Sequence, residues 1–158
     1  MQVPPTIILD LDHTLFNTEK LKTLLVRTCK EAGILPFVFW RAYRAMRKER
    51  TFSASHLLAA MPGSTFEDLH AKRILKTQLE KIITHSDAYI YHDARSLLRW
   101  LSKVQYRIVL YTYGDEATQK LKAQSLRRYC RVDDTMVTPC EAKDAGIGAP
   151  FPSVGAWE

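Results

Sequence analysis

The feature that most constrains this chain is an apolar run near the N-terminus that ends in two acidic residues. The run Thr6-Ile-Ile-Leu9 leads into Asp10, and Asp12 follows two residues later. An apolar run without polar alternation is typical of a strand buried on both faces, as in a parallel sheet. Such sheets bind ligands at the carboxyl ends of their strands. Because a buried carboxylate is costly without a partner, we expect a cation or a proton at this end of the strand.

The pattern Asp10-x-Asp12-x-Thr14 behind such a strand resembles the first motif of the haloacid dehalogenase-like (HAD) superfamily, whose members are mostly phosphohydrolases. The resemblance implies that Asp10 is the nucleophile that forms an aspartyl-phosphate and that Asp12 is the general acid and base. It also implies that Thr14 fixes the turn after the strand. Asp12 argues against the dehalogenase branch, whose members typically lack this second aspartate. The alternative is an acidic turn without a function.

Two further positions resemble later motifs of this family. The apolar segment Tyr106–Thr112 ends in a threonine, and the hydroxyl at this place in the family binds a phosphoryl oxygen. The alternative for Thr112 is a residue that serves only the strand, since β-branched residues favour strands. Lys143 follows a short strand expected near Thr135–Thr138 and resembles the lysine of the third motif, which stabilises charge on the phosphoryl group. The alternative for Lys143 is a solvated surface lysine.

The resemblance stops after Lys143. The fourth motif of the family is an apolar strand ending in acids that complete a Mg²⁺ site, but glycines and prolines interrupt the residues that remain here. The pair Asp133-Asp134 precedes a strand, so we interpret it as a turn or strand entry. We therefore expect a truncated HAD-like protein that binds Mg²⁺ weakly, through the Asp10 carboxylate and the backbone carbonyl of Asp12.

The block between the first two motifs has a helical pattern. One helix is expected through residues 21–28, ending near Gly33. Others are expected over residues 37–50 after Pro36 and over residues 69–83 after the capping box Ser64-x-x-Glu67. A helical insert at this place resembles the C1-type cap of the superfamily, which closes over the active site. We expect an α/β fold with a Rossmann-like parallel sheet. Residues 1–16 and 89–158 would form the core, and residues 17–88 the inserted helical cap.

Charge is concentrated in the first part of the expected cap. Residues 19–50 contain nine Lys or Arg and three Glu, which accounts for the whole net charge of +6. The basic residues of the segment Arg41–Arg50 either form a solvated helix face or steer an anionic substrate toward the cleft. Nucleic acid is not expected as a partner, because Trp40 and Tyr43, which could stack on bases, are more typical of core residues. A second basic helix, Glu116–Arg128, is expected to pack through Ala117, Leu121 and Leu126.

The remaining features limit the class of protein. No apolar stretch approaches the length of a transmembrane helix and no secretory signal is present, so we expect a cytoplasmic protein without a membrane partner. The three cysteines share no metal-type spacing and are expected to be reduced. The predicted function is hydrolysis of a small phosphorylated substrate. The alternative is a non-catalytic phosphate-binding or interaction protein.

One expectation concerns assembly. In the resembled fold, strands that come after the third motif cover the free side of the first strand, and this chain ends before it can supply them. The first strand would then be an exposed sheet edge, which is a template for pairing with another chain. We expect a homo-oligomer, a partner-bound state or aggregation.

Overall fold

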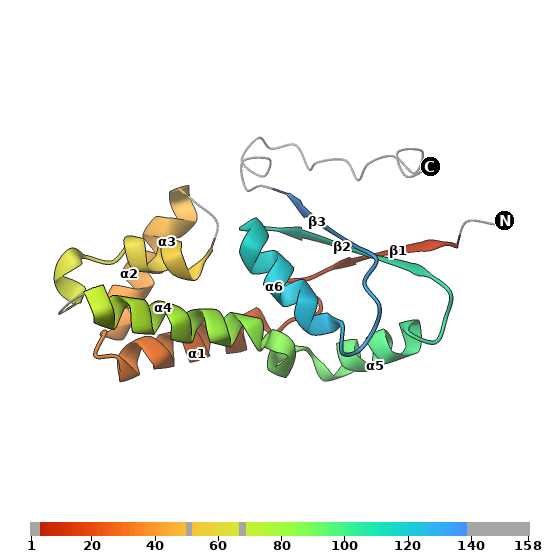
Figure 1. The fold of residues 1–158 in the computed structure, drawn as a ribbon, viewed down its shortest axis with the longest axis horizontal. Helices are drawn as coiled ribbons and strands as arrows, with labels where there is room; N and C mark the ends of the chain where they lie inside the picture. The colour runs from red at the N-terminus through yellow and green to blue at the C-terminus, as the bar shows by residue number, and fades with distance from the viewer. Residues whose placement is uncertain (1–3, 50–51, 67–68, 139–158) are drawn as a thin grey trace.

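The computed structural model describes residues 4–49, 52–66 and 69–138, which form a three-stranded sheet with helices beside it and a further group of helices at one end (Figure 1). No helix in these ranges is long and apolar enough to cross a membrane. The strands are β1 (Thr6–Asp10), β2 (Arg107–Tyr113) and β3 (Asp134–Thr138). The helices are α1 (Thr18–Glu31), α2 (Pro36–Glu49), α3 (Ala54–Ala59), α4 (Leu69–Thr84), α5 (His92–Leu101) and α6 (Glu116–Leu126), with short 3-10 turns η1 (Gly63–Thr65) and η2 (Ser86–Tyr89).

The three strands run parallel in the order β1–β2–β3. Ile8 of β1 lies opposite Val109 of β2, and Val109 lies opposite Asp134 of β3. Parallel neighbours need a crossover connection, which α1 to α5 supply for the first pair and α6 for the second. The predicted α/β class with a parallel sheet is confirmed. The interpretation of the acidic pair as a strand entry is also confirmed, because Asp133 Oδ2 accepts the Ile108 N–H at 2.8 Å and Asp134 begins β3.

The first strand is less buried than its apolar sequence predicts. Ile7 and Leu9 pack against the apolar cluster that the sheet forms with α5 and α6, whereas Ile8 on the opposite face is 37% exposed. The prediction of a strand buried on both faces is therefore wrong for the part of the chain described. An apolar run shows what a strand is able to bury, but it does not show whether another element covers each face.

The expected helices are present, with small differences at their ends and one additional short helix. α1 ends before Gly33, which has a φ of 82°, and α2 begins at Pro36 itself. α4 begins at Leu69, where the helix was expected. Ser64 of the expected capping box lies in the 3-10 turn η1, which has no side-chain cap hydrogen bond, and its partner Glu67 lies outside the described residues. The short helix α3 was not predicted; its N-cap Ser53 accepts a hydrogen bond from the His56 N–H.

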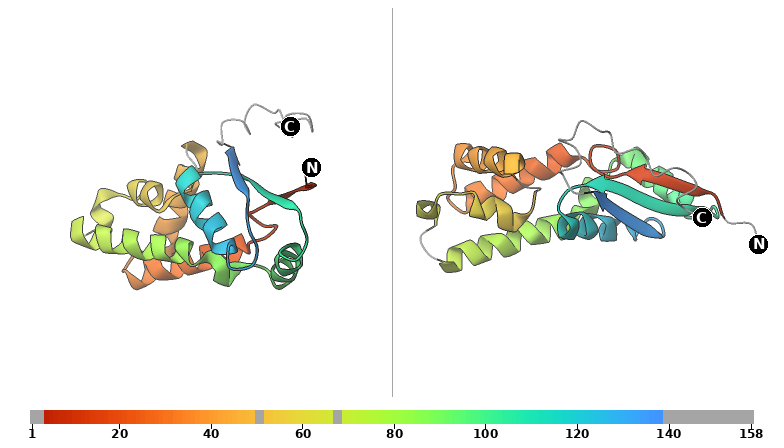
Figure 2. Two further views of the ribbon diagram at one scale, coloured as in Figure 1. Left: turned by 45° about the vertical axis from the view of Figure 1, so that its right-hand side comes forward. Right: turned by 90° about the horizontal axis from the view of Figure 1, so that it is seen from above.

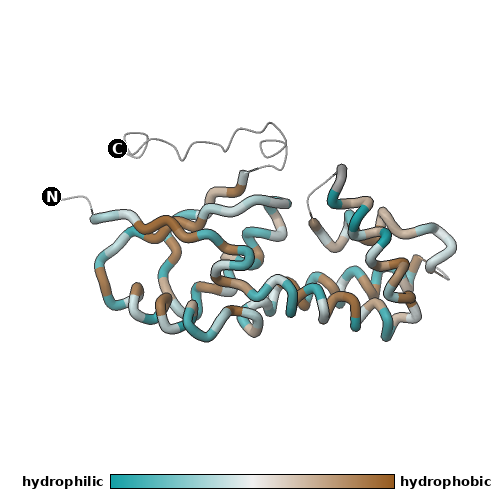
Figure 3. The backbone as a smooth tube through the Cα atoms, turned by 180° about the vertical axis from the view of Figure 1, so that it is seen from behind, coloured by the Kyte–Doolittle hydropathy of each residue, from teal (hydrophilic) through white to brown (hydrophobic). Residues whose placement is uncertain are grey.

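Apolar side chains form two clusters. One lies among α1 to α4 and includes Leu25 and Leu79; the other lies between the sheet and helices α5 and α6 and includes Leu98 and Leu110. Figure 3 shows hydrophobic residues along the strands as well as among helices α1 to α4. Tyr89 contacts both clusters. Two clusters of this kind are what a core with an inserted helical cap would produce, and the boundaries after residues 16 and 88 stay a prediction.

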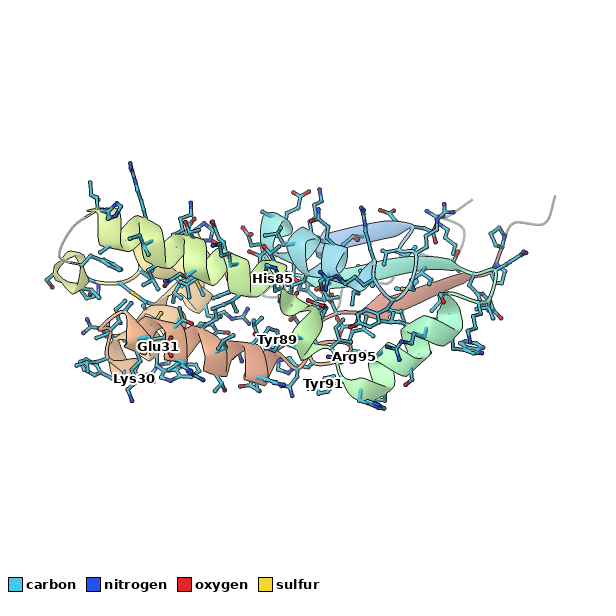
Figure 4. The ribbon with its side chains drawn as sticks, turned by 60° about the horizontal axis from the view of Figure 1, so that its bottom comes forward. Lys30, Glu31, His85, Tyr89, Tyr91 and Arg95 are labelled. Atoms are coloured by element: carbon cyan, nitrogen blue, oxygen red, sulfur yellow. The ribbon has the colours of Figure 1, made fainter. Side chains whose placement is uncertain are left out.

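The two connections between these clusters lie side by side. The Asn17 N–H donates to the Tyr89 carbonyl at 2.8 Å, and the Tyr91 N–H donates to the Leu15 carbonyl at 3.0 Å. Figure 4 shows Tyr89 and Tyr91 at this junction, between the end of α4 and the start of α5. The helical group is thus joined to the sheet by two hydrogen-bonded segments.

Helix α6 also packs against α4, so it links the sheet to the helical group (Figure 2). Its buried face is largely polar: Thr118, Gln119, Lys122 and Ser125 are each at most 8% exposed. Ala117 is exposed, so the prediction that α6 packs through this residue is wrong. Buried polar side chains need hydrogen-bond partners. Gln119 and Lys122 find these partners just beyond the end of β1.

Candidate active site

Asp10 is the last residue of β1, and its side chain is exposed at the carboxyl end of the strand. The Thr14 hydroxyl donates a hydrogen bond of 2.6 Å to Asp10 Oδ2. This bond restricts rotation of the carboxylate and leaves Oδ1 without a donor among the described residues. An oriented and accessible carboxylate oxygen is suited to nucleophilic attack.

A tight turn after Asp10 directs the next acid toward α6. The N–H groups of Leu15 and Phe16 both donate to the Leu11 carbonyl at 3.0 Å, and these three side chains are buried in the cluster beneath the sheet. His13 has a φ of 63°, in the left-handed region that few residues other than glycine adopt. The buried side chains anchor the turn and so determine the direction of Asp12.

Three side chains bind the Asp12 carboxylate. Lys122 Nζ lies 2.7 Å from Oδ1 and 3.0 Å from Oδ2. Gln119 Nε2 donates to Oδ2 at 2.9 Å, and the Thr18 hydroxyl donates to Oδ1 at 3.0 Å. The Lys122 side chain is 5% exposed and that of Asp12 is 26% exposed. Asp12 is therefore held in a largely buried ion pair.

The ion pair determines the charge of Asp12. Burial acts to raise the pKa of this carboxyl, because the ionised form loses its water. The Lys122 ammonium, together with the hydrogen bonds from Lys122, Gln119 and Thr18, more than offsets burial and holds the pKa of Asp12 below its usual 3.8. At neutral pH, Asp12 is able to accept a proton but has none to donate while Lys122 stays in place.

Neither Gln119 nor Lys122 is part of a motif that the sequence reveals. They share one face of α6 because they are three residues apart, and α6 begins directly after β2. Asp115 caps the helix by accepting the Thr118 N–H at 2.9 Å. Gly114 precedes the cap with a φ of 147°, and a Cβ atom there would lie 2.6 Å from Gln119 Nε2. The available signal was a polar stripe at helical spacing, on the side where an amphipathic helix carries apolar residues.

Thr112 lies at the same end of the sheet as Asp10. Tyr111 is the register partner of Asp10, and Thr112 is the next residue of β2. Its side chain is buried. The structure thus brings the two predicted motif positions to one end of adjacent strands. Lys143 lies outside the described residues, so its contact with a phosphoryl group stays a prediction.

A cavity of about 60 Å³ opens beside Asp12. On one side it is bordered by α6 and the end of β2, including Tyr113, Gln119 and Lys122. The other side belongs to the helical group, which contributes Leu21, Lys22, Leu25, Tyr43, Arg47 and Phe52. The cavity therefore lies where the helical group meets the carboxyl end of the sheet, next to the predicted catalytic residues.

The oxygen atoms at this end of β1 are suited to Mg²⁺, which prefers oxygen ligands. The Asp10 carboxylate is exposed, and no described residue donates a hydrogen bond to the Asp12 carbonyl. The Asp12 carboxylate is instead occupied by Lys122, Gln119 and Thr18. Within residues 4–49, 52–66 and 69–138, no group of three or more His, Cys, Asp or Glu side chains could hold a metal. The described residues fit an ion held by one carboxylate and one backbone carbonyl.

Comparison with known proteins identifies the fold. No protein-family model matches the chain, and no curated protein matches it. A haloacid dehalogenase-like family hydrolase from Xanthomonas campestris superposes on 85% of the chain with a TM-score of 0.57 and 16% identity. A haloacid dehalogenase-like hydrolase from Burkholderia xenovorans superposes on 85% with a TM-score of 0.53 and 17% identity. The chain has the HAD-like fold. The family resemblance of the sequence is thus confirmed for the fold.

A third structure with the HAD-like fold is the HAD-hydrolase YfnB from Bacillus subtilis, solved with magnesium bound. It superposes on 92% of the chain with a TM-score of 0.50 and 16% identity. The HAD-like chain spans 61% of the Xanthomonas structure, 62% of the Burkholderia structure and 67% of YfnB. At these identities the likeness concerns the fold alone.

Proposed function

We propose that this HAD-like chain hydrolyses a phosphomonoester through an aspartyl-phosphate on Asp10. The observation that carries the proposal is the exposed Asp10 carboxylate at the end of β1, oriented by the Thr14 hydroxyl at 2.6 Å and followed two residues later by Asp12. An Asp10 oxygen would bond to phosphorus as the ester bond to the leaving oxygen breaks. Water would then attack phosphorus, breaking the bond to Asp10 and releasing phosphate.

Asp12 would move the protons of both steps. It would give a proton to the leaving oxygen in the first step and take one from water in the second. Its ionised state beside Lys122 suits the second step directly. In the first step Asp12 must carry a proton, which requires its contacts with Lys122 to loosen. A leaving group that departs easily as an anion needs this proton least, so we expect aryl phosphates to be better substrates than alkyl phosphates.

Other groups would act on the phosphoryl oxygens. Mg²⁺, held by the Asp10 carboxylate and the Asp12 carbonyl, would supply positive charge against these oxygens when bound. The Thr112 hydroxyl would donate a hydrogen bond to one of them, and Lys143 would add a cation. These roles follow from the family resemblance. The position of Thr112 beside the end of β1 supports its part.

The test is hydrolysis of 4-nitrophenyl phosphate with Mg²⁺ by the wild type and by Asp10→Asn. We expect turnover by the wild type, none by Asp10→Asn, and a phosphorylated protein in the mass spectrum of acid-quenched wild type only. Asp93→Asn is the matched control, because Asp93 is an exposed acid on α5. Wild-type activity in Asp10→Asn would exclude Asp10 as the nucleophile.

A second candidate function is binding of phosphorylated ligands without turnover. It is favoured by one observation: no group of three or more His, Cys, Asp or Glu side chains that could hold a metal occurs in the described ranges. The same assay separates the two functions. If the wild type binds phosphate in calorimetry but shows neither turnover nor a phosphorylated intermediate, the chain is a binding protein.

A further inference from the structure

We infer that the substrate is a phosphomonoester whose leaving group carries a second negative charge. Arg47, which lines the same cavity as Asp12, would bind this charge. The inference rests on the proposed phosphohydrolase function and adds the class of substrate. It is carried by the charges of the cavity walls, by the position of Arg47 on α2, and by one unpaired acceptor on the opposite wall.

The cavity has more cations than acids. The described residues that line it include Lys22, Arg47 and Lys122 but only one acid, Asp12. Lys122 is paired with Asp12. Lys22 is paired with Glu19 at 2.6 Å. Among the acids whose side chains the structure describes, none pairs with Arg47, so we take its charge to be available to a ligand.

The position of Arg47 is specific among the arginines of α2. Arg41 and Arg44 lie on the same helix and are also exposed, but neither lines the cavity. Arg44 Nε instead donates to the Trp40 carbonyl at 3.3 Å. The arginines of α2 therefore fall into two groups. Arg41 and Arg44 lie on the solvated face of the helix, and Arg47 lines the cavity that opens beside Asp12.

The opposite wall presents an acceptor that would repel an anion. Gln119 is 5% exposed, and its Oε1 is buried without a hydrogen-bond donor among the described residues. Its Nε2 donates both to Asp12 Oδ2 at 2.9 Å and to the Tyr113 carbonyl at 2.7 Å. Flipping the amide would lose both bonds, so the orientation is determined by its partners. A second anion is thus disfavoured near Gln119 and favoured at Arg47.

The body of the leaving group would lie between aromatic walls. Tyr43 and Phe52 line the cavity with ring centroids 5.9 Å apart, and Tyr113 lines it from the end of β2. A cavity of this size holds roughly four to six water molecules. The geometry therefore suits a compact leaving group with a flat or apolar body and an anionic end.

The test compares two isosteric probes, 4-carboxyphenyl phosphate and 4-carbamoylphenyl phosphate, which differ in the charge of the distal group. We expect the wild type to favour the carboxylate, and Arg47→Gln to reduce that preference in kcat/KM about tenfold, the effect of one charge-assisted hydrogen bond. Comparing the ratio of the two probes between proteins cancels their different intrinsic reactivity. Arg44→Gln is the matched control on the same helix and should keep the wild-type ratio.

The outcomes separate this inference from the proposed function. If Arg47→Gln slows both probes equally, Arg47 binds the transferred phosphoryl group or acts on folding, and the inference is wrong while Asp10-dependent hydrolysis stands. If Arg47→Gln changes neither probe, the inference is also wrong. If no Asp10-dependent hydrolysis exists, the proposed function fails. Calorimetric binding of both probes to Asp10→Asn and to its Arg47→Gln double variant then still decides whether Arg47 recognises the carboxylate.

Discussion

At the residue scale, the site contains two nearby aspartates with different surroundings. Among the described residues, Asp10 remains exposed with one hydrogen-bond donor, whereas Asp12 is largely buried with three partners. The two carboxylates therefore differ in charge stabilisation and access although they are two residues apart. The same contrast would let one act as a nucleophile and the other as a proton carrier.

The Thr14 hydroxyl should matter through orientation of Asp10. Thr14→Val removes the donor with little change in shape, and we expect it to lower kcat/KM about tenfold, the value of one hydrogen bond to a charged group. Thr14→Ser keeps the hydroxyl and should restore most of the activity. Steady-state kinetics with 4-nitrophenyl phosphate measure both. Equal loss in both variants would indicate that the side chain acts through packing.

Lys122 should stabilise the fold by neutralising Asp12. Lys122→Met leaves the Asp12 carboxylate without its cation, and we expect a loss of about 1–3 kcal/mol in the free energy of unfolding, less than for a fully buried pair because Asp12 keeps some contact with water. The double variant with Lys122→Met and Asp12→Asn should lose less unfolding free energy than the sum of the losses in the two single variants. Urea denaturation of the four proteins gives the coupling. Additive effects would show that the ion pair contributes nothing.

The same pair predicts a dependence on pH. The pKa of Asp12 is lower in the folded protein than its usual 3.8, so the unfolded state takes up the proton first as pH falls. The stability that Asp12 contributes is present above the unfolded pKa and is lost as pH falls through the folded pKa. We expect the difference in unfolding free energy between wild type and Asp12→Asn to shrink below about pH 4. A difference that stays constant down to pH 2 would contradict this prediction.

At the element scale, the turn between β2 and α6 positions the polar face of α6. Gly114 has a φ of 147°, and a Cβ atom there would lie 2.6 Å from Gln119 Nε2. We expect Gly114→Ala to destabilise the protein by about 2–3 kcal/mol through backbone strain and displacement of Gln119. Gly63→Ala is the control, because nothing lies within 4 Å of its Cβ position and its φ is ordinary. Thermal unfolding that shows equal shifts for both would refute a special role for Gly114.

At the scale of the whole molecule, the exposed edge should promote association. β1 pairs only with β2 in the described ranges, and Ile8 on its open face is 37% exposed. We expect this 158-residue chain to self-associate at micromolar concentration, and Ile8→Lys to reduce association because a charge on an edge strand opposes pairing. Leu69→Lys, which replaces a more exposed apolar residue on α4, should change nothing. Sedimentation of the wild type and both variants measures their association, and a stable wild-type monomer would contradict the prediction.

The sequence by itself predicted the three strands and the longer helices in their order, although not the short helix α3. Apolar runs ending in Asp10 and Thr112 identified adjacent parallel strands, and Pro36 and Gly33 marked a helix start and a helix end. These features depend on local spacing and on backbone conformation, which neighbouring residues in the chain determine. The same local pattern carried the family resemblance that the fold confirms.

Only the tertiary structure decided which side chains meet. Lys122 and Asp12 are far apart in the sequence and come within 2.7 Å because α6 packs beside the turn after β1. Arg47 lines the cavity, whereas Arg44 on the same helix does not. The exposure of Ile8 depends on what covers the sheet and not on its own strand. Contacts and burial are properties of packed elements, so no pattern within one element could have determined them.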